Sequence, residues 1–453
     1  MWVRRILIAF AVLALLAFMG LRLFSPNGPD LIEREATGSA SFDTGALLVL
    51  SDLDMAATGY ADAKLLQLPE GRDTLTVLTG LDSNAPARAE LAVSNSVVGW
   101  PGSLVISPDG TRAYVTETQG EIDNGIQEVE DPYNIVDGRV VTALDISNPM
   151  TPRVLGTLDV CRKPNSVSID AQARYLIIGC SDDVSPLVAV TLNPDGTLGE
   201  RRDLGFADGG KRARPGVGFA QLSPNGQRVA VTLGDTNIAF VDIAFGEDRL
   251  PVSASYVGTP YPIADSWLSM GRWSPDGRFY ISTDTAWGPG PMDAVRNDAG
   301  RVLSVSPEGG VVSEVRTSLS TEALEFDPSG TLIAAANMER TYLPETGLPY
   351  TLFGRRHQSS LNLIGFDPDA GQLTLLDGPL ATDAILPEDV MFDDDGDALA
   401  IVSYQDTKDG MPQSAWMEIF KVERTDGSAR LLPTGRRIDL PRGAHDLGIV
   451  RAR

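Results

Sequence analysis

The chain has 453 residues, of which 61 are acidic and 37 basic, so its net charge is −24 at pH 7. Because nucleic acids and anionic lipid surfaces are polyanions, this charge argues against both as partners. The chain holds only two histidines and two cysteines, which excludes a multi-histidine metal centre within one chain. Haem-attachment, zinc-protease, P-loop and nucleophile-elbow motifs are absent from the sequence, and we expect neither a metal nor a cofactor.

The chain begins with an apolar run from Ile6 to about Gly20, preceded by Arg4 and Arg5. A membrane-spanning helix needs about 17–25 apolar residues and a signal-peptide core about 7–15, so the run lies between the two. Because no clear cleavage site of small residues follows, we favour an uncleaved hydrophobic helix with the arginine pair on the cytoplasmic side. A cleaved signal peptide is the alternative.

These patterns divide the chain into an anchor (1–24), a polar, flexible tether (25–44) and a folded domain (45–453). We expect the domain to face the periplasm from the inner membrane. With a cleaved signal peptide it would be secreted or periplasmic. In the anchored form, the N-terminal helix is the contact with the membrane.

Three apolar runs follow the tether, at 46–52, 63–69 and 74–80, and each is expected to be a strand. After them a unit recurs, in which a tight turn joins two short apolar strands. The copies are SLVISPDGTRAYVTE (103–117), SVSIDAQARYLIIGC (166–180), GFAQLSPNGQRVAVTL (218–233), MGRWSPDGRFYISTD (270–284), ALEFDPSGTLIAAAN (323–337) and DVMFDDDGDALAIVS (389–403). Proline presets φ within these turns and glycine supplies a positive φ, so the turns fit hairpins.

Two further strands follow each hairpin, which gives units of four antiparallel strands, A to D. Radial repetition of such units forms a β-propeller, an all-β fold. Six complete units can be counted, and the first three runs read as strands B, C and D of a seventh. Its missing strand A is the C-terminal AHDLGIV (444–450), so we expect seven blades in a ring that the C-terminal strand closes.

Cys161 precedes the first strand of one hairpin, and Cys180 ends its second strand. The two residues should therefore lie nearly opposite each other, within reach of a disulfide bond. Such a bond is consistent with export to an oxidising compartment.

The long insertions fall between strands B and C, which places them on the same face as the D–A connections. Loops on a rigid scaffold commonly carry function, so we expect the ligand site at a channel mouth on this face. Polar residues at the starts of inner strands can instead satisfy backbone groups around the channel. The candidate ligand-binding residues are His445, Asp446, Asp389, Glu322, Lys211, Arg212 and Arg355.

The segments GTLIAAANMERTY (330–342), RRHQSSLNLIGFDPDAGQLTLL (355–376) and PEDVMFDDDGDALAIVS (387–403) resemble the 6-phosphogluconolactonase-like family of seven-bladed propellers. Segments such as SPDGTRAYVTE also resemble YVTN-type propeller repeats. The family resemblance implies a histidine, an arginine and a glutamate that activate water on a lactone. The matching candidates are His357, Arg356 and Glu388.

We therefore expect a membrane-anchored extracytoplasmic propeller that binds a small molecule or a periplasmic protein on its loop-rich face. The alternative is a lactonase-like hydrolase with a His/Arg/Glu site at the channel mouth. Repeat patterns specify a fold and not an activity, so the sequence alone leaves both open.

Overall fold

A computed structural model describes Leu15 and residues 28–452, except 38, 70, 84, 97–100, 123–124, 131–134, 182–183, 206–215, 235, 264–265, 289–296, 347–356, 409 and 426. Apart from Leu15, the expected N-terminal helix lies outside these residues. Within the described part of the chain, no helix is long and apolar enough to cross a membrane.

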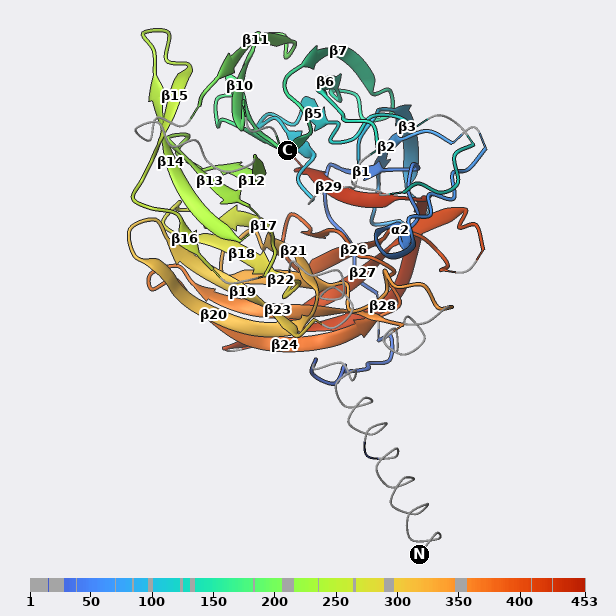
Figure 1. The fold of residues 1–453 in the computed structure, drawn as a ribbon. Helices are drawn as coiled ribbons and strands as arrows, with labels where there is room; N and C mark the ends of the chain where they lie inside the picture. The colour runs from blue at the N-terminus through green and yellow to red at the C-terminus, as the bar shows by residue number, and fades with distance from the viewer. Residues whose placement is uncertain are drawn as a thin grey trace, which may run out of the picture.

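The described residues form seven antiparallel sheets, arranged around a central axis as the blades of a propeller (Figure 1). Blade 1 contains β29 (Ala444–Val450), β1 (Ala46–Ser51), β2 (Thr74–Thr79) and β3 (Ala87–Ala92). Blade 2 contains β4 (Leu104–Ile106), β5 (Arg112–Thr116), β6 (Val140–Asp145) and β7 (Arg153–Asp159). Blade 3 contains β8 (Pro164–Ile169), β9 (Tyr175–Cys180), β10 (Leu187–Leu192) and β11 (Leu198–Asp203).

The remaining blades follow the same order, from the inner strand to the outer one. Blade 4 contains β12 (Val217–Leu222), β13 (Arg228–Leu233), β14 (Asn237–Phe245) and β15 (Pro251–Tyr256), and the short β16 (Tyr261–Pro262) pairs with β14. Blade 5 contains β17 (Leu268–Trp273), β18 (Tyr280–Asp284), β19 (Ala299–Ser306) and β20 (Gly310–Leu319). Blade 6 contains β21 (Thr321–Phe326), β22 (Leu332–Asn337), β23 (Ser359–Asp367) and β24 (Gln372–Thr382). Blade 7 contains β25 (Val390–Phe392), β26 (Ala398–Ser403), β27 (Ser414–Thr425) and β28 (Ser428–Pro441).

The hairpin turns have the chemistry that the repeats predict. In the first copy, the Ser107 hydroxyl donates to Asp109 Oδ1 at 2.6 Å, and the Gly110 amide donates to the Ser107 carbonyl at 2.8 Å. Gly110 has φ of +67°, a conformation that side chains with a Cβ disfavour. These turns end the inner strands on one face of the disc, which we call the turn face. The long B–C insertions lie on the opposite face, the loop face.

Blade 1 takes a strand from each end of the folded chain. β29 pairs antiparallel with β1, with Leu47 opposite Ile449 and Val49 opposite Leu447. The order of the other strands in this blade corrects one expectation. Residues 74–79 form the third strand and 87–92 the fourth, whereas 63–69 belong to a loop around the short helix α2 (Gly59–Asp62). Leu65 is fully buried in that loop, so the apolar run reflects loop packing.

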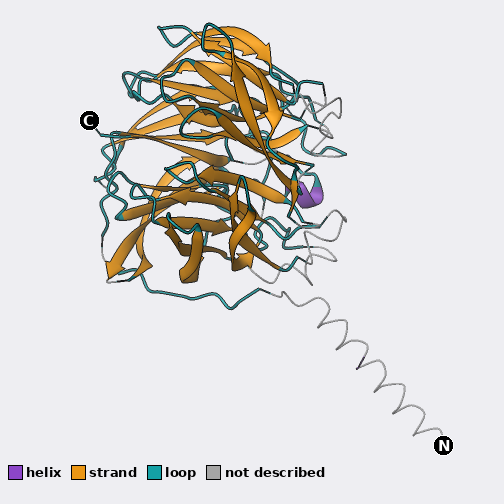
Figure 2. Ribbon diagram, turned by 90° about the vertical axis from the view of Figure 1, so that its left-hand side faces the viewer, coloured by secondary structure: helices purple, strands orange, loops and turns teal. Residues whose placement is uncertain are grey.

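Residues 28–37 and 39–44 run along the outer strands of blades 6 and 7, so part of the expected tether contacts the propeller. Ile32 forms a parallel bridge with Leu380 of β24, and the Arg34 guanidinium binds the Asp377 carboxylate at 2.6 Å. Phe42 is 1% exposed and packs into the core. Figure 2 shows this segment passing along the edge of the disc.

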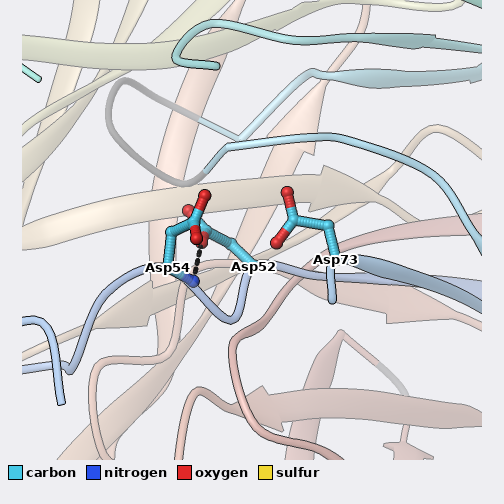
Figure 3. Close-up of side chains that lie close together, drawn as sticks. All are labelled: Asp52, Asp54 and Asp73. Carbon is cyan, nitrogen blue, oxygen red and sulfur yellow. Dashed lines mark hydrogen bonds between the residues drawn. The ribbon is translucent and has the colours of Figure 1, made fainter. Parts of the chain in front are cut away.

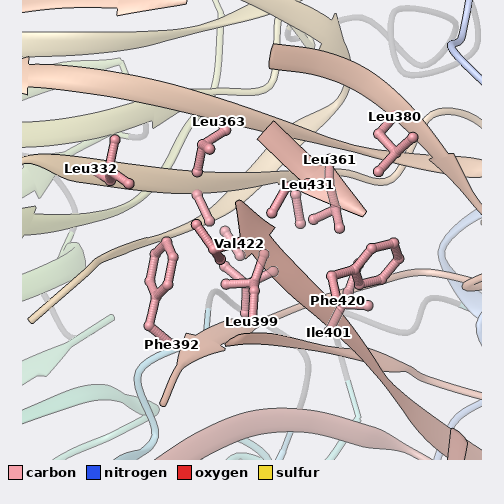
Figure 4. Packing of buried hydrophobic residues seen from close by; sticks show 14 of the residues in the cluster. Leu332, Leu361, Leu363, Leu380, Phe392, Leu399, Ile401, Phe420, Val422 and Leu431 are labelled. Carbon is pink, nitrogen blue, oxygen red and sulfur yellow. The ribbon is translucent and has the colours of Figure 1, made fainter. Parts of the chain in front are cut away.

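The cores lie between neighbouring blades. The core between blades 6 and 7 joins Leu361 and Leu363 of β23 to Leu399 and Ile401 of β26 (Figure 4). Strand β22 adds small alanines that let the sheets approach. Within blade 3, Cys161 and Cys180 form the expected disulfide bond, which is confirmed.

Candidate active site in the central channel

One position of the repeat faces the channel in successive blades. It lies three residues before the second residue of each hairpin turn, which is Pro275 in blade 5 and Pro328 in blade 6. The position is therefore occupied by Arg272 in blade 5 and by Glu325 in blade 6. At the corresponding position the other complete blades have Val105, Ser168, Gln221 and Met391. Because side chains alternate along a strand, residues two positions earlier form a second layer nearer the loop face.

A cavity of about 230 Å³ occupies the turn-face half of the channel. Its lining comes mostly from the second halves of the inner strands: Gly102, Leu104, Val105, Ile106, Val167, Ser168, Phe219, Ala220, Gln221, Arg272, Gly448 and Ile449. Most of these residues are apolar. Arg272 is the only charged residue among those described in the lining, so it defines the chemistry of the cavity.

Arg272 is held by a carboxylate from the next blade. Its Nε donates to Glu325 Oε2 at 2.8 Å, and the two side chains keep 17% and 19% of their surface exposed. Burial disfavours the charged guanidinium, but the carboxylates of Glu325 and Asp389 outweigh that effect, so the pKa of Arg272 is raised. The channel therefore holds a charged arginine–glutamate pair that remains accessible.

Two aspartates of the second layer bind backbone groups of neighbouring inner strands. Asp446 Oδ2 accepts the amides of Gly102 and Leu104, each at 3.0 Å, and Asp389 Oδ2 accepts the Leu447 amide at 2.9 Å. Inner strands have unpaired N–H groups on the channel side, and these side chains satisfy them. Burial raises the pKa of Asp446 to about 6 even though Arg272 opposes the shift. Burial and the charge of Asp446 also raise the pKa of Asp389.

Glu322 and Glu388 form a buried pair nearer the loop face. They are 3% and 2% exposed, and their side chains share a hydrogen bond. Glu322 is the extra residue of a β-bulge, because Thr321 and Ala323 pair with consecutive residues of β22. Burial raises the pKa of Glu322 to about 8. Burial, followed by the charge of Glu322, raises the pKa of Glu388.

His445 is buried and neutral. Its Nε2 lies 2.7 Å from Asn95 Oδ1, and Asn95 donates its own amide hydrogens to the carbonyls of Val93 and Ser51. The asparagine oxygen is thus the acceptor and the histidine the donor. Burial lowers the pKa of His445 to about 3, so at neutral pH this histidine orders the start of β29 and carries no charge.

Three aspartates meet close to this point, as Figure 3 shows. Asp52, Asp54 and Asp73 each offer a carboxylate oxygen within 4.8 Å of the others, a spacing that could suit a cation. Asp73 accepts the amides of Leu53 and Asn95, each at 3.0 Å. Burial, together with the charge of Asp52, raises the pKa of Asp54 to about 7 and that of Asp73 well above its ordinary value.

The loop face covers the channel at this end instead of opening it. Side chains from at least five loops form an apolar cluster that includes Met55, Trp287, Tyr342, Leu386 and Tyr404. The Trp287 indole donates to Ser320 Oγ at 2.9 Å. The B–C insertions therefore act as a second core above the inner strands, and Glu322, Glu388, Asp389, His445 and Asp446 lie buried.

The three residues suggested as catalytic by resemblance are not seen together. His357 is on the surface, with 60% of its side chain exposed and its Nδ1 3.6 Å from Glu345 Oε1. Glu388 is buried with Glu322 as its partner. Arg356, Arg355, Lys211 and Arg212 lie outside the described residues.

Sequence reasoning missed Arg272 and Glu325. Each precedes its turn proline by three residues, at Pro275 and Pro328. Aligning the six hairpin repeats at their turns would have shown a channel-facing position that is polar in four of them.

Comparisons with known proteins support the fold. No family model matches the sequence, and no curated protein matches it. The periplasmic gluconolactonase of Pseudomonas aeruginosa is 16% identical with a TM-score of 0.58, and the match covers 90% of this chain and 100% of that one. A candidate 6-phosphogluconolactonase of Bacteroides uniformis is 15% identical with a TM-score of 0.58, covering 89% and 99% of the two chains. The chain is a seven-bladed propeller with lactonase-type structural neighbours, as its repeats predict.

Proposed function

We propose that this protein is a lactonase-like hydrolase whose reaction takes place in the channel cavity. The observation that carries the proposal is the Arg272–Glu325 pair, in which an arginine that lines a cavity of about 230 Å³ binds a partly exposed carboxylate. Pockets for drug-sized ligands measure about 300–1,000 Å³, so this one suits a single small ring. The structural neighbours named as lactonases add support at the level of the fold.

Each member of the pair has a distinct role in the proposed reaction. Glu325 takes a proton from a water molecule as the water oxygen attacks the lactone carbonyl carbon. Arg272 donates hydrogen bonds to the oxyanion that develops on the carbonyl oxygen. The acyl C–O bond of the ring then breaks, and the proton held by Glu325 passes to the released alkoxide oxygen. The product is an open-chain hydroxy acid, and no other reactant is needed.

Lactone hydrolysis by the full-length protein tests this proposal directly. Glu325→Gln and Arg272→Gln should each lower kcat/KM on a hydrolysed lactone by about 100-fold or more, as expected for loss of a general base or an oxyanion donor. Arg278→Gln is the matched control, because Arg278 pairs with Asp276 on an exposed turn. If both channel variants keep wild-type rates, the assignment of this site is wrong.

Ligand binding without catalysis remains the alternative function, with a small molecule or a periplasmic protein bound on the loop face. It predicts no turnover of any lactone by the wild-type protein. Location is also part of our proposal: we place the propeller in the periplasm, anchored through residues 1–24. The Cys161–Cys180 bond supports an oxidising compartment. Extraction of cell membranes with alkaline carbonate separates an anchored chain, which stays with the membrane, from a released one.

A further inference from the structure

The charges around the cavity restrict which lactones can bind there. Resting on the proposed function, we infer that the substrate is an uncharged lactone, such as that of a neutral sugar acid, and that the site rejects lactones carrying a phosphate or a carboxylate. The inference concerns the substrate class and depends on the residues that surround Arg272.

The positive charge of Arg272 is already balanced by a carboxylate, although its Nη groups can still donate hydrogen bonds. Its Nε is bound to Glu325 at 2.8 Å, which makes the pair neutral. Asp389 and Asp446 are close enough to act on its charge. The Arg272–Glu325 pair is neutral, and an ionised Asp389 or Asp446 adds a negative charge. The net charge of these four side chains is therefore zero or negative.

A phosphate site in a protein is built differently. It combines several N–H donors, helix N-termini or arginines with free bidentate edges. The amides of Gly102 and Leu104 border this cavity, but both already donate to Asp446. A phosphate placed here would face carboxylates across a region of low dielectric constant, where repulsion is strong. The overall charge of −24 also slows the approach of anions.

The rest of the lining suits a neutral polar ring. Gln221 uses its Oε1 to accept the Trp273 amide at 2.9 Å, which directs its amide hydrogens to other acceptors such as a sugar hydroxyl. Beside Gly102 and Gly448, the space that a side chain would take is filled by neighbouring apolar groups, of Phe219 and of Leu104 and Ile106. Apolar faces from Val167 and Phe219 complete the lining.

The test compares glucono-1,5-lactone with its 6-phosphate, using full-length protein. We expect kcat/KM for the neutral lactone to be higher by about 100-fold at low salt, and the ratio to fall as salt screens the repulsion. Asp446→Asn removes one negative charge while its amide oxygen can still accept both backbone amides. The variant should reduce the discrimination by about 10-fold.

Binding measurements separate this inference from the proposed function. The lactam of gluconic acid and its 6-phosphate are not hydrolysed, and calorimetry reports their affinities without catalysis. Preference for the phosphorylated lactone and lactam would overturn the inference and leave the lactonase proposal standing. Absence of turnover together with binding of only the neutral lactam would overturn the enzyme proposal and support the charge selection. Equal binding of both lactams would refute the charge selection.

Discussion

The buried pair Glu322–Glu388 predicts that the protein is more stable at pH 5 than at pH 8. The pKa of Glu322 rises from an ordinary value of 4.5 to about 8 because of burial. Between these two pH values the folded state therefore keeps a proton that the unfolded state loses. The stabilisation that Glu322 contributes is fully present below about pH 4.5 and is lost as the pH rises to about 8. At about 1.4 kcal/mol per pH unit, this one group changes the free energy of unfolding by at most about 5 kcal/mol.

The assay is urea unfolding of the full-length protein between pH 5 and pH 9. Glu388→Gln keeps a hydrogen-bonding group beside Glu322 but removes a carboxyl, so the variant should gain about 2 kcal/mol at pH 8 relative to wild type and show a shallower pH dependence. Glu200→Gln is a matched control, since the Glu200 side chain is 68% exposed. A wild-type protein equally stable at pH 5 and pH 8, or a Glu388→Gln variant with an unchanged slope, would refute the reasoning.

Three further predictions concern the disulfide bond, strand β29 and the exposed side chain of His357. Cys161→Ser should lower the free energy of unfolding by about 3 kcal/mol, because the bond closes a loop with a sequence separation of 19; urea unfolding under non-reducing conditions measures this, and a reductant should erase the difference. Deletion of residues 443–453 removes β29 and should sharply lower the melting temperature, whereas Arg451→Ala changes it little; an unchanged melting curve for the deletion would contradict the role of β29 in blade 1. His357→Ala should leave the rate of lactone hydrolysis within about 2-fold of wild type, because this side chain is exposed. A 100-fold loss would instead indicate that the active site lies on the loop face.

The fold was predictable because its units repeat and each turn has its own chemistry. Hairpins such as 103–117 combine alternating apolar strands with proline and glycine at fixed turn positions, so local signals agree with the global architecture. The pairing of the C-terminal strand with β1 followed from counting strands. The third and fourth strands of blade 1 were misplaced because residues 63–69 look like a strand but form part of a loop core.

The site was harder to predict because function here depends on contacts between blades. Arg272 and Glu325 are 53 residues apart, and only the ring brings them together. The charged residues at the starts of inner strands stood out in the sequence, yet Asp389 and Asp446 bind backbone amides and His445 is neutral. Nothing in the loop sequences indicated that Trp287 and Tyr342 would pack over the channel.

The N-terminal segment that contains Ile32 and Asp43 passes from one face of the propeller toward the other. Asp43 lies on the turn face, where its carbonyl accepts the Asp394 amide at 2.9 Å, and Ile32 lies beside the end of β24 that approaches the loop face. Followed back from Asp43 to Ile32, the segment therefore runs from the turn face toward the loop face (Figure 2). A protein held at the loop-face end of this segment would keep the Arg272 cavity, which lies toward the turn face, turned away from its point of attachment.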